Sequence, residues 1–410
     1  MTGEILFLAH RIPFPPDRGD KIRSHHLLQR LAQLAPVHVA TFADDEDDAE
    51  AETELAALAR SYHVVRRPNS LLLAGIQGLL RDEAVSLPAF HSDKLVGYVA
   101  KVLAEHPIET IFVFSGQMGQ YVPDDFAGRV IVDFCDVDSA KFEAYAAAHR
   151  WPESWIHARE GRLLRREERR LALRADRCLL ISAEEAALFA ERLPPLERGA
   201  VSIGVLGNGI DSDRFAPGVV AAEPRLAALP RGRVVFTGQM DYPPNVAAVQ
   251  RFARGILPLV RRQVPAATFH VIGREPTEAV LALGEADGCS IWGRVEDMRP
   301  WLAGADIAAV PLAIARGVQN KVLEAMAMGL PVVLTSGAAT GIAASDGEHF
   351  CVADGDAAIA AQIVALLGDP VRAAEIGRAA RDYVVQQQSW PAALGPLDAL
   401  LGVRTVRHAA

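Results

Sequence analysis

The chain has 410 residues, of which 50% are hydrophobic and 23% are charged. This length predicts two or three domains, and the apolar content excludes intrinsic disorder as the main character of the chain. The formal net charge of −9 gives no reason to expect nucleic acid as a partner.

The four cysteines are scattered along the sequence and form no CxxC pair. This pattern predicts neither a zinc site nor a disulfide framework, and it favours a reducing cytoplasm. The first residues lack the basic region of a signal peptide. The longest apolar run, 71–80, is about half as long as a membrane-spanning helix requires. We therefore expect a cytoplasmic protein, with a core or interfacial segment at this run.

Short apolar runs alternate with amphipathic segments in the first 210 residues. We predict a helix over 22–34 and strands over 4–9, 37–42, 111–114, 130–134 and 178–181. The acidic stretch 43–54 predicts a solvated loop or a helix start. The arginine-rich segment 160–174 predicts a charged surface helix, and a face that meets anionic lipid or a phosphorylated acceptor is the alternative.

The alternation restarts after the proline-rich segment 217–230, which predicts a linker. We predict strands over 234–238, 268–273, 289–292, 307–311 and 332–335, and helices over 245–263, 278–283, 298–303, 320–328 and 357–388. Two such arrays predict an α/β protein with two Rossmann-like, doubly wound parallel sheets facing each other across a cleft. The expected domains are 1–216 and 231–388.

The segment 317–333 carries the strongest functional signal. It opens the predicted helix 320–328, whose first turn offers unpaired amides and a positive dipole end to a phosphate. Lys321 can add a point charge to the same phosphate, and an ionised Glu324 can accept hydrogen bonds from a ribose diol. An ordinary buried helix with a solvated Lys321–Glu324 pair is the alternative.

The same segment resembles the signature of GT-B glycosyltransferases of the retaining GT4 type. Residues 322–333, VLEAMAMGLPVV, are similar to the second half of the family motif, and Arg316 stands where the first glutamate is usual. Gly317, Lys321 and Glu324 fit a Gly-x-x-x-Lys-x-x-Glu variant of that motif. The resemblance implies no identified catalytic residue, with Lys321 and Arg316 as candidates.

Further segments follow the family order over nearly the whole chain, including a glycine loop at 236–240 and a nucleobase loop at 293–297. The resemblance implies a donor-binding set of Gly19, Gly238, Arg274, Val295, Asp297, Gly317, Val318, Gln319, Asn320, Lys321 and Glu324. It also implies a C-terminal crossover, about 389–410, that packs back onto the first domain. No metal is expected, because helix dipoles and cations can offset a leaving diphosphate.

The loop after the first strand is locally cationic, with Arg18, Lys21 and Arg23. An anionic group is expected there, and a proline-rich turn with solvated cations is the alternative. Asp136 follows the predicted strand 130–134. We take these four residues as acceptor-side candidates.

Three segments together resemble the sugar transferases of PEP-CTERM/exosortase exopolysaccharide systems: HRIPFPPDRGDKIRS, VDFCDVDSAKF and ARGVQNKVLEAMAMGLPVV. This resemblance implies retaining transfer from a nucleotide-diphosphate sugar to a saccharide or polyprenyl-linked acceptor, without a cofactor. It implies a cytoplasmic enzyme and leaves open peripheral contact with the inner membrane. Two alternatives stay open: a GT-B-fold nucleotide-sugar epimerase and a non-catalytic assembly subunit.

Overall fold

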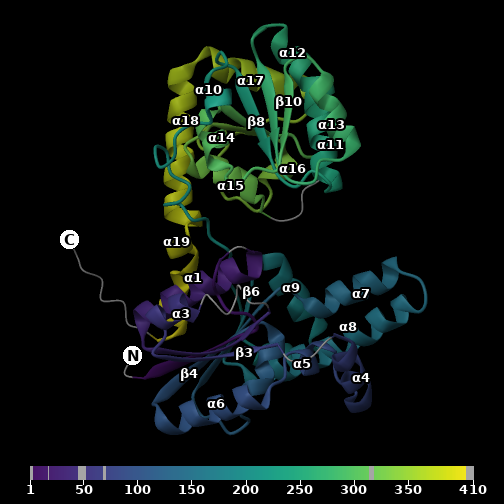
Figure 1. The fold of residues 1–410 in the computed structure, drawn as a ribbon, viewed down its shortest axis with the longest axis vertical. Helices are drawn as coiled ribbons and strands as arrows, with labels where there is room; N and C mark the ends of the chain where they lie inside the picture. Colours follow the sequence, from purple (N-terminus) through teal and green to yellow (C-terminus); the bar gives the residue numbers. More distant parts are fainter. Residues whose placement is uncertain (1–2, 17, 45–51, 68–70, 314–317, 403–410) are drawn as a thin grey trace, which may run out of the picture. The chain divides into compact units, whose positions relative to one another are not determined.

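The structure is a computed structural model that describes residues 3–16, 18–44, 52–67, 71–313 and 318–402. Contacts divide the chain into two units (Figure 1). Unit 1 comprises Met1–Asn208 and Ala393–Ala410, and unit 2 comprises Gly209–Ala392. The division falls at Asn208, and the proline-rich segment 217–230 belongs to unit 2, where it contributes the short helix α10 (Pro224–Ala227).

Unit 1 contains a seven-stranded sheet in the order β3-β2-β1-β4-β5-β6-β7, and every pair is parallel. Its strands are β1 (Glu4–Ala9), β2 (Val37–Ala43), β3 (Ser61–Arg66), β4 (Ile108–Phe114), β5 (Arg129–Cys135), β6 (Arg177–Leu180) and β7 (Ile203–Val205). The central strands are almost wholly apolar and buried, because helices cover both faces of a parallel sheet.

The helices of unit 1 connect these strands and lie against the sheet (Figure 1). They are α1 (Gly19–Leu34), α3 (Glu52–Leu58), α4 (Leu71–Arg81), α5 (Ser86–Ala89), α6 (Asp93–Glu105), α7 (Asp138–Ala148), α8 (Glu153–Arg174) and α9 (Ala183–Arg192), with 3₁₀ turns at Gly116–Tyr121 and Arg198–Ala200. Helices α7 and α8 pack side by side.

Unit 2 contains a six-stranded parallel sheet in the order β10-β9-β8-β11-β12-β13. Its strands are β8 (Arg233–Thr237), β9 (Thr268–Ile272), β10 (Cys289–Gly293), β11 (Ile307–Val310), β12 (Val332–Leu334) and β13 (Cys351–Val352). Both sheets have doubly wound order, which confirms the predicted fold class. The strand order reverses between β8 and β11, and ligands of such sheets bind beside the carboxyl ends of the strands at this reversal.

The helices of unit 2 cover both faces of its sheet (Figure 1). They are α11 (Pro243–Arg251), α12 (Leu257–Arg261), α13 (Glu278–Leu281), α14 (Arg299–Gly304), α15 (Asn320–Ala327), α16 (Ser336–Ala339), α17 (Asp356–Gly368) and α18 (Pro370–Tyr383). Helix α19 (Trp390–Leu394) contains the division between the two units. A 3₁₀ turn lies at Ala282–Glu285, and π-helical turns lie at Phe252–Ile256 and Val384–Gln388. Among the described residues, no single helix is long and apolar enough to cross a membrane. One bent pair of helical segments, Asp356–Gly368 with Pro370–Gln388, has the length and the apolar composition of a membrane-spanning segment.

The end of the described chain belongs to unit 1. Helix α20 (Pro396–Leu400) buries Leu397. Arg30 of α1 donates to both carboxylate oxygens of Asp398, at 2.5 and 2.6 Å. Arg129 of β5 donates to the carbonyl of Leu400 at 3.1 Å. These contacts place the C-terminal part of the predicted crossover on the first unit.

Candidate functional site

The loops after β8 and β11 meet at the strand reversal of unit 2. Gly238 directly follows β8, and its φ of +150° lies in the region that side chains rarely adopt. A Cβ at this position would lie 3.0 Å from Asn245 Nδ2 and 3.1 Å from Lys321 Nζ. The topology therefore brings two predicted donor-site residues, Gly238 and Lys321, to one place.

Lys321 lies in the first turn of α15 and is half-buried. Its Nζ donates to Oδ1 of Asn245 at 2.5 Å and lies 4.5 Å from the centroid of the Phe236 ring. Burial lowers the pKa of Lys321 to about 8, against the opposing effect of Glu324. A phosphate bound at this ammonium would favour its charged form.

Asn245 positions Lys321 and was not among the predicted site residues. It is buried near the start of α11. Its Nδ2 donates to the carbonyl of Gln239 at 2.8 Å, which holds the loop after β8. One amide group thus ties the glycine loop to the lysine. The signal that could have found it is its place just after Pro243–Pro244 at the start of the helix that follows the glycine loop.

The loops after β8 and β9 interlock. A Cβ on Gly273 would lie 1.6 Å from the carbonyl oxygen of Gly238, so any side chain at position 273 would push the two loops apart. The amide of Met240 donates to the carbonyl of Arg274 at 2.9 Å. The exposed Arg274 guanidinium donates to Gln239 Oε1 at 3.1 Å. Arg274 therefore lies beside the glycine loop and is bound to a neutral amide, and its role toward the donor stays a prediction.

Glu324 lies one turn beyond Asn320 on α15 and is half-buried. Burial raises the pKa of its carboxyl, and the charges of Lys321 and Arg214 lower it. The Arg214 amide donates to Asp211 Oδ1 at 2.9 Å, which fixes the turn that carries this arginine. An ionised Glu324 offers the acceptors that a ribose diol needs.

The remaining donor-site candidates of unit 2 differ in their contacts and in their exposure to solvent. Asp297 accepts from Arg299 Nε at 2.9 Å, and this hydrogen bond lowers the pKa of the Asp297 carboxyl. Val295 is half-buried against the core. Val318 is 43% exposed just before Gln319 and Asn320 at the start of α15. Arg316 and Gly317 lie outside the described residues.

The candidates of unit 1 surround the start of α1. Gly19 is the first residue of this helix, and a Cβ there would meet open space. The exposed Arg18 lies 3.6 Å from Asp44. Lys21 is buried and donates to the carbonyl of Phe14 at 3.4 Å. Asp136 is exposed directly after β5. The roles of these residues toward donor and acceptor stay predictions.

Arg23 has a different environment from the one we predicted. It lies inside α1 and is 2% exposed, so its assignment to a solvent-facing cationic loop is wrong. Its guanidinium donates four hydrogen bonds, to the Asp133 carboxylate, to the carbonyls of Leu206 and Gly207 and to the side chain of Asn208. Its Nη2 also lies 2.8 Å from the Asp133 carboxylate. The charge of Arg23 is therefore neutralised by contacts within unit 1.

Three residues with strained backbone mark the carboxyl ends of strands. Ser115 after β4, Cys135 at the end of β5 and Glu275 after β9 have φ values of 74°, 63° and 57°. Residues other than glycine seldom adopt this region, and such strain gathers at functional sites. The Ser115 amide donates to the Asp133 carbonyl at 2.8 Å, which fixes this turn. Composition gave no signal of this strain.

A cluster of metal-ligand types lies at the other end of the first sheet. Ligand atoms of Glu4, His38 and His106 lie within 4.8 Å of one another, at the amino ends of the strands. The Glu4 carboxylate already contacts His38 Nε2 at 2.6 Å and the Arg60 guanidinium at 3.1 Å. A guanidinium beside the only carboxylate of this cluster opposes a bound cation, and the ion-pair network accounts for the arrangement.

Comparisons with known proteins agree with this geometry. Residues 231–369, which contain the glycine loop and α15, match the model of the family described as glycosyl transferases group 1. A GDP-mannose-dependent alpha-(1-6)-phosphatidylinositol monomannoside mannosyltransferase from Mycolicibacterium smegmatis is 27% identical over 97% of this chain and 98% of its own.

Solved structures of the same fold cover the whole length. Sucrose-phosphate synthase from Thermosynechococcus elongatus has a TM-score of 0.63 at 18% identity, over 98% of both chains. Alr3699/HepE from Anabaena, in complex with UDP, has a TM-score of 0.63 at 16% identity, over 97% of this chain and 99% of its own. The chain is therefore a glycosyltransferase of GT-B fold, and its residues 231–369 are similar to the glycosyl transferases group 1 family.

Proposed function

We propose that the enzyme transfers a sugar, with retention, from a nucleoside-diphosphate sugar to a saccharide or polyprenyl-linked acceptor in exopolysaccharide biosynthesis. The observation that carries this proposal is the meeting of Lys321 with Gly238 at the strand reversal of unit 2. A half-buried ammonium, the first amides of α15 and a side-chain-free backbone segment form a site for a diphosphate.

The same groups provide the catalytic contribution that we propose. Negative charge develops on the diphosphate as the glycosidic bond breaks, and fixed positive groups stabilise it without a metal ion. The acceptor hydroxyl attacks on the face that the diphosphate leaves, and its proton passes to the departing phosphate oxygen. Donor and acceptor held together lose their translational entropy on binding instead of in the chemical step. No residue of the chain needs to act as a nucleophile.

GDP-mannose is the first donor to test, because the full-length relatives that match are named as GDP-mannose-dependent enzymes. UDP-glucose is the second, because the HepE structures hold UDP or UDP-glucose. The lipid-linked acceptor is supported by the relatives' names, which describe a phosphatidylinositol glycolipid as the acceptor. All four cysteines are free thiols, which supports our placement of the enzyme at the cytoplasmic face of the inner membrane.

Thermal-shift measurements with UDP, GDP, ADP, CMP and dTDP and their common sugar derivatives test the donor. We expect one nucleotide series to stabilise the wild-type enzyme and to have a weaker effect on Lys321→Ala. Arg254→Ala, at an exposed arginine of unit 2, is the matched control and should respond as the wild type does. If no nucleotide binds in this screen, the proposal is wrong, and the alternative of a non-catalytic assembly subunit is favoured.

Product analysis separates transfer from isomerisation. The enzyme is incubated with the donor alone and then with a polyprenyl-linked saccharide. We expect a new glycosidic bond of retained anomeric configuration only when the acceptor is present. Formation of an epimerised nucleotide sugar without acceptor would replace the proposal with the epimerase alternative.

A further inference from the structure

Helix α4 of unit 1 exposes three large apolar side chains and buries two small residues. Ala74 is fully buried, and a Cβ on the buried Gly78 would lie 3.0 Å from the carbonyl of Glu83. At Ala74 and Gly78 the helix backbone therefore packs closely against the protein. Ile76, Leu79 and Leu80 are 49%, 57% and 83% exposed. This is the reverse of the pattern that a helix on the surface of a water-soluble domain normally shows.

Helix α8 places a stripe of arginines against the end of α4. Arg159, Arg162 and Arg166 lie on one face, at the spacing i, i+3 and i+7. Their guanidinium groups lie 3.7, 3.8 and 3.9 Å from the single carboxylate of Asp82, which follows α4. Arg159 also donates to the carbonyl of Gly78 at 2.8 Å, which ties the two helices together. Three cations that share one anion leave a net positive surface.

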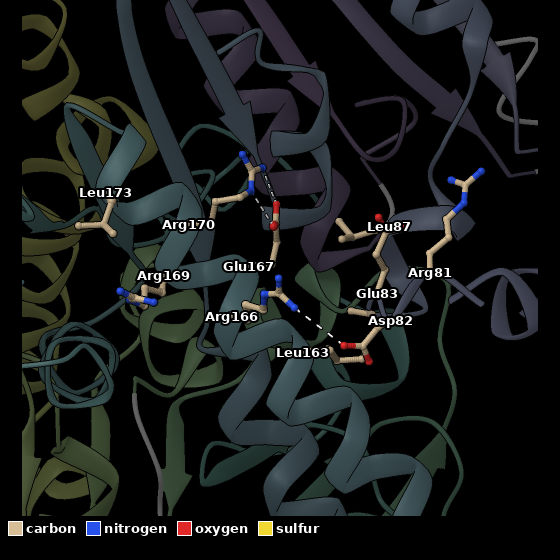
Figure 2. Close-up of a pocket in the computed structure, with 11 residues that line it drawn as sticks. Arg81, Asp82, Glu83, Leu87, Leu163, Arg166, Glu167, Arg169, Arg170 and Leu173 are labelled. Carbon is tan, nitrogen blue, oxygen red and sulfur yellow. Dashed lines mark hydrogen bonds and ion pairs between the residues drawn. The ribbon is translucent and has the colours of Figure 1, made fainter. Parts of the chain in front are cut away.

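The exposure of these arginines differs along the stripe. Arg162 and Arg166 are 64% and 75% exposed, while Arg159 is nearly covered. Neighbouring arginines of the helix are neutralised, because Arg169 pairs with Glu197 and Arg170 with Glu167. Figure 2 shows Arg166 pointing toward Asp82 and Arg170 toward Glu167. Arg165 is exposed as well, and it donates to the carbonyl of Arg192, which leaves its charge unneutralised. The positive charge available to a partner on this part of α8 therefore lies at Arg162, Arg165 and Arg166.

Arg166 borders a cavity of about 540 Å³ between the end of α4 and α8 (Figure 2). Its lining combines apolar side chains such as Leu163 and Leu173 with arginines and with the carboxylates that pair with them, Asp82 and Glu167. Trp155, 55% exposed, lies one turn before Arg159 on the same face of α8. An exposed tryptophan at the end of an arginine stripe is typical of a protein segment at a membrane interface.

We propose that this α4–α8 surface, formed by Ile76, Leu79, Leu80, Trp155, Arg162 and Arg166, binds an anionic lipid bilayer. The apolar side chains of α4 enter the boundary between headgroups and acyl chains, and the guanidinium groups bind lipid phosphates. Charge complementarity selects this partner, since the surface combines unneutralised cations with apolar side chains that water solvates poorly. The inference deepens the proposed lipid-linked acceptor, but it concerns a surface away from Lys321 in sequence and needs no donor.

Co-sedimentation with vesicles tests the full-length enzyme. We expect binding to phosphatidylcholine vesicles that contain phosphatidylglycerol and no binding to phosphatidylcholine alone. Arg162→Ala with Arg166→Ala should weaken binding about 30-fold, at roughly a fivefold loss for each arginine near an anionic surface. Leu79→Ser with Leu80→Ser should weaken binding at every salt concentration, since its contribution is apolar. The arginine variant should lose the salt dependence of binding.

Two matched pairs in unit 2 serve as controls: Arg254→Ala with Arg262→Ala, and Leu281→Ser with Val371→Ser, all at exposed positions. We expect both controls to bind vesicles as the wild type does. All variants should keep the wild-type melting temperature and nucleotide response, so that failure of lipid binding is distinct from failure of the proposed function.

Three results would overturn the inference. The first is equal vesicle binding by the wild type and by both surface variants. The second is a wild type that ignores anionic vesicles but binds inorganic phosphate through Arg162 and Arg166, which would make the surface a phosphate site. The third is dimer formation in light scattering that Leu79→Ser with Leu80→Ser abolishes, which would make it a protein interface.

Discussion

Two basic side chains, one in each unit, are held in opposite ways. In unit 1, Arg23 forms an ion pair with the buried Asp133 carboxylate, to which its Nε donates at 2.9 Å. In unit 2, Lys321 donates to the neutral amide of Asn245 and lies over the Phe236 ring. A cation neutralised inside its own unit stabilises the fold, whereas a cation held by an amide keeps its charge for an anionic ligand.

The largest effect is expected at the neutralised cation. Arg23→Ala leaves the Asp133 carboxylate buried without its partner, and breaking such a pair costs about 3–5 kcal/mol of the free energy of unfolding. Urea unfolding followed by circular dichroism measures this loss. Arg18→Ala, at a residue whose side chain is 46% exposed, is the control and should change stability by less than about 0.5 kcal/mol. If Arg23→Ala instead kept wild-type stability and impaired acceptor binding, the two units would not differ as described.

A second buried group in unit 1 makes stability depend on pH. Burial raises the pKa of Glu168 to about 7, although the amide and hydroxyl of Ser139 donate to it. A carboxyl with a raised pKa stabilises the fold below its unfolded pKa of about 4.5, and this contribution is lost as the pH rises through about 7. The free energy of unfolding of Glu168→Gln, relative to that of the wild type, should therefore increase by up to about 3 kcal/mol as the pH rises from 5 to 8.

Unfolding of both proteins at pH 5, 6, 7 and 8 measures this difference. Glu167→Gln, at the neighbouring position on α8 where the half-buried carboxylate pairs with Arg170, is the control for the loss of a carboxylate from this helix. A difference in the free energy of unfolding between Glu168→Gln and the wild type that stays constant across this range would contradict the raised pKa of Glu168.

Removal of the available cation should affect activity and leave the fold intact. Lys321→Ala loses a charged hydrogen bond to the donor diphosphate, which is worth about 1.5–3 kcal/mol, and so lowers kcat/KM about 10- to 100-fold. Its melting temperature should stay near that of the wild type, because desolvation already disfavours the charged lysine in the folded state. Steady-state kinetics with calorimetry separates the two effects. A large loss of stability with unchanged kcat/KM would show that Lys321, like Arg23, stabilises the fold and does not serve the donor.

The smallest effect is a pH dependence of donor binding. The pKa of Lys321 in the free enzyme is lowered to about 8 by burial. The ammonium therefore loses its charge as the pH rises through this value, and kcat/KM should fall by up to about tenfold per pH unit above it. Lys321→Arg keeps a cation at every accessible pH and should flatten the profile at a reduced plateau. A wild-type profile that stays level to pH 9.5 would contradict this role.

The sequence predicts the central strands well, and of the four edge strands it predicts β10 alone. The predicted strand 4–9 coincides with β1, and the predicted helix 245–263 covers α11, its π-helical turn and α12. Central strands of parallel sheets are uninterrupted apolar runs with clear ends. The unpredicted β3, β7 and β13 lie at or near the sheet edges. One face of such strands stays open, so polar residues such as Tyr62 and His63 dilute the apolar signal.

The sequence predicts which residues belong to the candidate site, but it does not predict which side chains they contact. Lys321 and Glu324 follow from a local pattern at a helix start. The bond from Lys321 to Asn245 spans 76 positions, and that from Arg23 to Asp133 spans 110. No local rule distinguishes these two cations, because burial and partners come from strand order. Arg23 therefore resembled a loop cation in the sequence, although the fold places it in the core of unit 1.

The return of α20 to unit 1 has a consequence for the order in which the chain matures. Unit 2 is contiguous from Gly209 to Ala392, whereas unit 1 is assembled from both ends of the polypeptide. Arg30 and Arg129 receive their partners Asp398 and Leu400 only after residues 393–402 leave the ribosome. Most of unit 1 is thus translated before unit 2 but completed after it, and a nascent chain halted before position 393 carries a complete unit 2 and an incomplete unit 1.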